Sequence, residues 1–157
     1  MSQLRTYRSR ARLVELDEDS ENIAVRGNVQ GEEIPESADQ RPFKQAGWRF
    51  MRRSSRPVGG DPRTDYARIL RRRRDGRLTL NLNRAIVKFS EQADDATIAR
   101  SLESVGGRIL KRVPLASNVF SVEFRPDRDV FDALDALSNL DHVDFAEPEL
   151  VEALGAR

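Results

Sequence analysis

The side chains that could perform chemistry are few in this sequence. It contains no cysteine and a single histidine, His142, which excludes disulfides, thiolate zinc sites and histidine-based metal clusters. His142 is also the one possible general base, and no Gly-x-Ser-x-Gly elbow or phosphate-binding loop accompanies it. We therefore expect a protein that is not an enzyme and that has no metal site and no cofactor.

Two carboxylates stand out near the C-terminal end, in the segment DHVDFAEPEL. Glu147 and Glu149 flank Pro148 directly after the strand-like stretch HVDFA, and proline cannot donate a hydrogen bond to a sheet. A mostly apolar tail, LVEALGAR, follows at residues 150–157. Because this tail comes after the last strand, the sheet is not expected to need it. Solvated charges and a frayed terminal helix are the alternative interpretation.

A run of four arginines at residues 71–74 could bind phosphate groups, since residues 49–77 contain eleven arginines. However, no aromatic platform interleaves with these charges, and the C-terminal half lacks the aromatic strand motifs of RNA-recognition domains. The chain has 24 Arg and three Lys, so arginine is its usual cation. We interpret the run as solvated surface and do not expect nucleic acid as a partner. A protein- or nucleic-acid-interaction module that uses this Arg-rich segment remains an alternative.

The elements that must position the acidic pair can be predicted from hydrophobic periodicity. Alternation with period 2 predicts strands, and apolar stripes with period 3.6 predict helices. The expected order is strand, helix, strand, strand, helix and strand, over residues 84–90, 94–105, 108–115, 119–124, 130–140 and 142–149. This is the order of the ferredoxin-like fold, an antiparallel sheet with two helices on one face. The predicted fold class is therefore α+β.

The other face of such a sheet would carry no helix. The residues that we expect on it as a docking surface are Lys88, Val119, Ser121, Glu123, His142 and Asp144, together with Ile86 and Ala146. A sheet face that mixes small and apolar residues is a candidate contact with another protein. A merely solvated face is the alternative.

Charge and composition divide the chain. Residues 1–83 carry 18 Lys and Arg against 12 Asp and Glu, whereas residues 84–157 carry 9 against 14. The predicted parts are a small β-rich N-terminal module, an Arg/Gly/Pro-rich linker, a ferredoxin-fold domain and a C-terminal tail, at residues 1–53, 54–76, 77–152 and 153–157. The N-terminal region is expected to contain a β-hairpin, RLVELDEDSENIAVR, and to be partly disordered.

Residues 84–152 resemble the propeptide domain of subtilases, the subtilisin-like serine proteases, and of free-standing inhibitors that share it. The resemblance is carried by AIVKF, GGRILKRVPL, NVFSVEF and HVDFAEPEL in this order and spacing. Residues 12–53 are more weakly similar to the N-terminal extensions of bacterial subtilase precursors. The resemblance implies a non-catalytic inhibitor and folding chaperone of a subtilisin-like protease, in cis before cleavage or in trans. An N-terminal fragment of a subtilase precursor is the alternative.

The resemblance also implies a mode of binding. The open sheet face would pack on two surface helices of the protease, and Glu147 and Glu149 would cap the N-termini of these helices. The C-terminal segment would lie in the active-site cleft as an added strand. This segment comprises Leu150, Val151, Glu152, Ala153, Leu154, Gly155, Ala156 and Arg157.

The sequence leaves the compartment open. No apolar run approaches the roughly 18 residues of a membrane-spanning helix, so no membrane contact is expected. The first residues, MSQLRTYRSRARL, are positively charged but lack the apolar region of an ordinary secretory signal. The location is therefore expected to be cytoplasmic by default, with export by another route left open.

Overall fold

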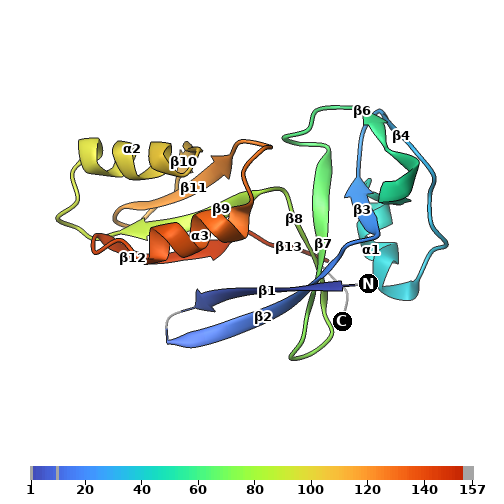
Figure 1. The fold of residues 1–157 in the computed structure, drawn as a ribbon, viewed down its shortest axis with the longest axis horizontal. Helices are drawn as coiled ribbons and strands as arrows, with labels where there is room; N and C mark the ends of the chain where they lie inside the picture. Colours follow the sequence, from blue (N-terminus) through green and yellow to red (C-terminus); the bar gives the residue numbers. More distant parts are fainter. Residues whose placement is uncertain (1, 10, 154–157) are drawn as a thin grey trace. The chain divides into compact units, whose positions relative to one another are not determined.

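The computed structural model describes residues 2–9 and 11–153 (Figure 1). The described chain divides into two compact units. Unit 1 holds residues 2–5, 15–82 and 150–153, and unit 2 holds residues 6–9, 11–14 and 83–149. Each unit is therefore assembled from segments that lie far apart in the sequence. Within the described residues, no helix is long and apolar enough to cross a membrane.

Unit 2 contains a four-stranded antiparallel sheet and two helices, in the element order predicted from the sequence. The elements are β9 (Arg84–Phe89), α2 (Asp95–Ser104), β10 (Gly107–Arg112), β11 (Val119–Phe124), α3 (Val130–Ser138) and β12 (Val143–Pro148). The strand order in the sheet is β10-β11-β9-β12. Helix α3 packs on β12 and β9, and α2 packs on β10 (Figure 1). The predicted α+β class is confirmed.

Both helices of unit 2 begin at an aspartate. Asp94 accepts a hydrogen bond from the Thr97 backbone N–H at 2.8 Å, and Asp129 accepts one from Phe131 N–H at 2.9 Å. Hydrogen bonds from the Thr97 side chain and backbone hold the pKa of the Asp94 carboxyl below its usual range. The stabilisation from this cap is therefore present above the unfolded-state pKa and is lost as the pH falls through the folded-state pKa. Gly106, at φ 71°, follows α2 and ends the helical path.

The core of unit 2 follows the predicted alternation of β9. Ala85, Val87 and Phe89 are fully buried, whereas the residues between them are half-buried. The aromatic ring of Phe89 meets that of Phe120 edge-to-face, with centroids 6.1 Å apart. Val122, Phe124, Ile98, Leu102, Leu134 and Leu137 are also buried.

Unit 1 is mainly β-structure. Its main sheet has the order β1-β2-β7-β3-β5, and β8 pairs with both β7 and β13. The further elements of the described chain are β1 (Ser2–Ser9), β2 (Arg12–Asp19), β3 (Asn22–Val25), β4 (Val29–Gln30), α1 (Arg41–Gln45), β5 (Arg49–Arg52), β6 (Val58–Gly59), β7 (Tyr66–Arg72), β8 (Leu78–Asn81) and β13 (Val151–Glu152), with 3₁₀ turns at Ala38–Gln40 and Arg53–Ser55. Strands β1 and β2 continue into unit 2 with residues 6–9 and 12–14.

The N-terminal half differs from the prediction in its pairing. β2 and β3 are strands as expected, but they do not form a hairpin with each other, because both pair antiparallel with β7 and therefore run in the same direction. β7 itself falls inside residues 54–76, which we predicted to be a linker. Ala67, Ile69 and Leu70 of this strand are buried. The arginines at its C-terminal end made the segment look like a linker in the sequence. The N-terminal region that was expected to be partly disordered therefore contributes paired strands to a folded unit.

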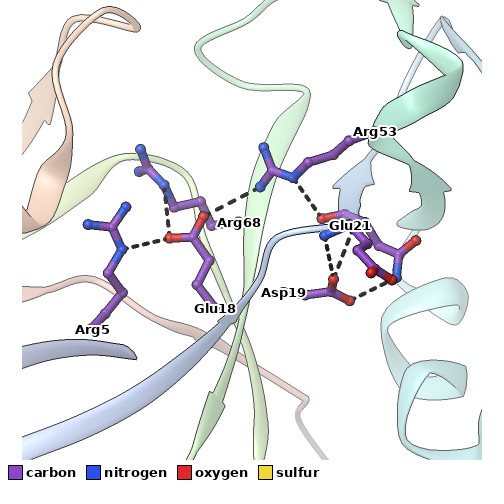
Figure 2. A network of polar contacts seen from close by, with 7 residues as sticks. Arg5, Glu18, Asp19, Glu21, Arg53 and Arg68 are labelled. Carbon is purple, nitrogen blue, oxygen red and sulfur yellow. Dashed lines mark hydrogen bonds and ion pairs between the residues drawn. The ribbon is translucent and has the colours of Figure 1, made fainter. Parts of the chain in front are cut away.

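A charged cluster around Glu18 lies within unit 1 (Figure 2). The Glu18 carboxylate is almost buried and contacts Arg5 Nε at 3.0 Å, Arg53 Nη2 at 3.5 Å and Arg68 Nε at 3.7 Å. Beside it, the Asp19 carboxylate accepts hydrogen bonds from the backbone N–H groups of Glu21 and Asn22, which closes the turn between β2 and β3. The cluster connects β1, β2, β7 and the segment after β5.

The apolar core of unit 1 is a cluster of nine buried residues. These are Ala24, Phe43, Trp48, Phe50, Ala67, Ile69, Leu78, Leu80 and Leu82. The rings of Phe43 and Phe50 meet edge-to-face at 6.4 Å. Val151 and Ala153, from the segment predicted to be a free tail, pack against this cluster.

Candidate functional site

The open face of the four-stranded sheet is the face that carries Ile86 and Lys88, opposite the buried residues of β9. The strand register places its side chains in rows. One row consists of Phe145, Lys88 and Val119; the next of Glu147, Ile86, Ser121 and Lys111; the third of Arg84, Glu123 and Arg108. This face therefore mixes apolar residues with charges of both signs.

The middle of the open face is less accessible than the sequence indicated. Val119, Ser121 and Glu123 lie on the predicted face, but they are 8%, 1% and 5% exposed. β11 is a central strand, and longer side chains reach over it. Arg108 Nη2 lies 3.4 Å from Glu123 Oε1, and the Glu149 carboxylate lies 3.4–3.5 Å from the Ser121 hydroxyl. A partner that approaches this face would meet these longer side chains first.

Two further predicted docking residues lie at the margin of the face and remain accessible. Lys88 Nζ is 3.9 Å from Asp144 Oδ2, and the two side chains are 36% and 46% exposed. An exposed pair at this distance contributes little to stability, about 0–1 kcal/mol. The ion pair between Lys88 and Asp144 can therefore break, and each side chain can bind a group on a partner, at a small cost in free energy.

His142, which we expected on the open face, lies on the helical side instead. Its Nε2 is 2.6 Å from the Ser101 hydroxyl of α2, and its ring stacks on Phe89 with centroids 6.1 Å apart. His142 belongs to the turn before β12, which begins at Val143, so it lies outside the alternation of the strand. Within β12, an irregularity between Val143 and Phe145 shifts the alternation and buries Ala146 opposite Val87, although Ala146 was also expected on the open face.

The acidic pair closes one end of the open face. Glu147 is opposite Ile86, and its carboxylate accepts a hydrogen bond from the Ser9 hydroxyl at 2.8 Å. The backbone N–H of Glu149 donates to the Arg84 carbonyl at 2.9 Å, so the chain is still held to β9 just past Pro148. The Glu149 carboxylate turns back over Ser121. Both carboxylates thus contact serine hydroxyl groups and are half-buried.

Sequence reasoning missed the contribution of the N-terminal strands to this site. Ser9, Ala11 and Arg12 line a hollow of about 640 Å³ together with Phe145 and Glu147. Ser9 and Glu147 are separated by 138 residues, so no local pattern could have connected them. The rim of the acidic end is therefore built from both halves of the sequence.

The segment after the acidic pair is paired rather than free. Val151 and Glu152 form β13, which pairs antiparallel with Leu80 and Thr79 of β8. The Glu152 carboxylate lies 3.6 Å from Arg72 Nη2 and 3.9 Å from Arg77 Nη2. The expectation that no sheet needs this segment is therefore wrong for the sheet of unit 1. Leu154, Gly155, Ala156 and Arg157 lie outside the described residues.

The arginine run at residues 71–74 is largely engaged in ion pairs. Arg71 contacts Asp39 at 2.7 Å, and Arg73 contacts Asp17 and Glu15 at 3.1 and 3.2 Å. Arg72 contacts Asp75 in addition to Glu152. Three of the four guanidinium groups thus form ion pairs with carboxylates of the same unit. Among the described residues, no group of three or more potential ligands could hold a metal ion.

Comparison with known proteins points to the same part of the chain. The searches of curated proteins and of solved structures found no match. The family model of the fervidolysin N-terminal prodomain matches residues 81–149, which include the whole four-stranded sheet and end at Glu149. This is a non-catalytic subtilase propeptide family, and it implies a subtilisin-like protease as partner in general. The predicted resemblance is thereby confirmed: residues 81–149 are similar to the N-terminal prodomain of a subtilisin-like serine protease.

Proposed function

We propose that this protein inhibits a subtilisin-like serine protease and assists the folding of that protease, in cis before cleavage or in trans as a separate chain. The observation that carries the proposal is the acidic pair, Glu147 and Glu149, at the end of the matched region and on the open sheet face. We further propose that residues 83–149 have the ferredoxin-like arrangement. The antiparallel strand order β10-β11-β9-β12 supports this assignment.

Docking would exchange weak hydrogen bonds for stronger ones. In the free protein, the carboxylates of Glu147 and Glu149 accept hydrogen bonds from the hydroxyls of Ser9 and Ser121. The N-terminus of a partner helix offers several unpaired N–H groups and a partial positive charge. A carboxylate gains from this exchange, because hydrogen bonds of ionised groups and the helix dipole add to each other. The two carboxylates are separated by one rigid proline, so each could accept hydrogen bonds from the N-terminus of a different, neighbouring helix of the partner.

The open face would supply the rest of the docking surface. Ile86 and Phe145 provide apolar contact, and Lys88 and Asp144 provide an accessible charged margin. The buried residues Ser121 and Glu123 would act through the side chains that cover them, Glu149 and Arg108. The C-terminal segment from Leu150 onward would enter the active-site cleft as an added strand and exclude substrate.

The experiment that tests the proposed function is an inhibition assay. The purified chain should inhibit a cognate subtilisin-like protease competitively, because cleft occupancy and substrate binding exclude each other. Interfaces of this type bury about 1,600 Å² in total and can be very tight. A panel of several subtilases should be measured beside a chymotrypsin-type protease, which shares the chemistry but not the fold and should be unaffected. Failure to inhibit any subtilase of the panel would refute the proposed function.

Removal of the negative charges should weaken binding without unfolding the protein. We expect Glu147→Gln and Glu149→Gln each to cost about 0.5–2 kcal/mol of binding free energy if the carboxylates cap partner helices. This corresponds to about a 2- to 30-fold rise in Kd. The glutamine side chain keeps an oxygen that can accept the hydrogen bond from the serine hydroxyl, so the melting temperature of the protein should hardly change.

Glu91→Gln is the matched control for this pair, because Glu91 is an exposed residue in the turn between β9 and α2. The control variant should bind the protease as the unaltered chain does. Equal affinities of all three variants, measured by calorimetry at low and high salt, would contradict the capping role.

A further inference from the structure

Unit 1 holds the first residues of the C-terminal segment. The chain leaves β12, passes Glu149 and adds β13 to the edge of β8. β8 is a fixed template, because all four of its residues are buried and it pairs with β7 on its other side. Thr79 and Leu80, the pairing partners of β13, are fully buried. Two residues of the segment are thus extended before any partner binds.

Side chains support this pairing from both faces. Val151 and Ala153 pack against the apolar cluster of unit 1. On the other side of the strand, the Glu152 carboxylate lies between the guanidinium groups of Arg72 and Arg77. These ion pairs are partly exposed and individually weak, so they select the position of the strand more than they stabilise it. β8, Arg72, Arg77 and the apolar cluster of unit 1 thus all contact a segment that the family match does not include.

We propose that the N-terminal half of the chain is a positioning element for inhibition: β8 holds Val151 and Glu152 as an extended strand for entry into the protease cleft. This inference rests on the proposed function. A flexible segment loses conformational entropy when it becomes an added strand, whereas a segment that is already extended does not. Along the described chain β13 pairs with β8 on one side only, so its second edge can pair with a strand of the cleft.

A different role for the same contact would be sequestration, in which β8 hides the segment and must release it before inhibition. The pairing involves two residues and two weak ion pairs. Such a weak contact can orient the segment but is too weak to withhold it from a tightly binding protease. The two roles predict opposite results when β13 is fixed to β8. This contrast provides the test.

The test is a disulfide that staples β13 to β8. The chain contains no cysteine, so a Thr79→Cys/Glu152→Cys double variant has one possible disulfide, between residues that are paired across the two strands. Leu80→Cys/Val151→Cys, at the neighbouring cross-strand pair, serves as a second, independent staple. Inhibition of the same subtilase is measured for each variant, oxidised and reduced, with the corresponding single variants as controls.

The positioning role predicts that the oxidised staple inhibits at least as tightly as its reduced form, and up to about tenfold more tightly. Loss of inhibition on oxidation that is restored by reduction would overturn the inference and assign sequestration to β8. The proposed function fails separately, if the unaltered chain inhibits no subtilase at all. An unaltered chain that inhibits, combined with inactive oxidised staples, therefore rejects the inference and leaves the proposed function intact.

Discussion

A chain truncated after Glu149 should lose at least about 100-fold in inhibition of its protease, equivalent to about 2.7 kcal/mol. It keeps the open sheet face and both carboxylates of the acidic pair, so it should still bind the protease. It lacks the segment that would occupy the cleft, and substrate can therefore enter. Binding measured by calorimetry and inhibition measured with a peptide substrate should thus separate. Undiminished inhibition by this truncated chain would exclude the cleft mechanism and leave a docking surface alone.

The same truncation should also lower the stability of unit 1. It removes β13 and withdraws Val151 and Ala153 from the apolar cluster, which costs about 1 kcal/mol for a half-buried valine side chain. A chain truncated after Ala153 is the matched control, since it keeps β13 and its contacts. A comparison of the two truncated chains isolates the contribution of β13 to folding, since they differ in residues 150–153. If both chains melt at the same temperature, β13 does not contribute to the fold as described.

Replacement of Phe89 by alanine should destabilise unit 2 by about 3–5 kcal/mol. Phe89 is fully buried between the edge of the Phe120 ring and the stacked His142 ring, and the neighbouring strands cannot close the resulting cavity. Since 1 kcal/mol shifts the melting temperature of a domain of this size by about 4–8 °C, the transition should fall by well over 10 °C. Urea titration followed by circular dichroism measures the loss.

Lys88→Ala provides the control for this variant, because Lys88 precedes Phe89 in the same strand and points to the opposite face. Its removal should change the free energy of unfolding by less than about 1 kcal/mol, since its ion pair with Asp144 is exposed and weak. Similar losses for the two variants would mean that β9 does not separate a buried face from an open one.

Local patterns in the sequence were sufficient to predict the elements between residues 84 and 148. Strong alternation around Ala85, Val87 and Phe89 predicted β9, and the stripe through Ile98 and Leu102 predicted α2. The start of α2 at Asp94 followed from capping chemistry, which depends on three or four adjacent residues. The resemblance to subtilase propeptides was visible for the same reason, because its motifs coincide with these strongly periodic elements.

Periodicity failed where a strand was short, charged or irregular. The arginine run concealed β7, since charged residues at its end outweighed the alternation of its first half. In β12, one irregular position between Val143 and Phe145 reversed the faces of the residues that follow it, so that Phe145 lies on the open face and Ala146 is buried. A period-2 pattern cannot report such a shift, because one extra residue exchanges the inside and the outside of a strand.

The sequence by itself determined the α+β class, the order of the elements between residues 84 and 148, and the position of the acidic pair at the end of β12. Only the tertiary structure decided what surrounds this pair. It brings Ser9 to Glu147 across 138 residues and pairs the segment after Glu149 with β8. The physical reason is that periodicity reports which face of an element is buried, whereas strand pairing depends on edges that become available only when distant segments fold together.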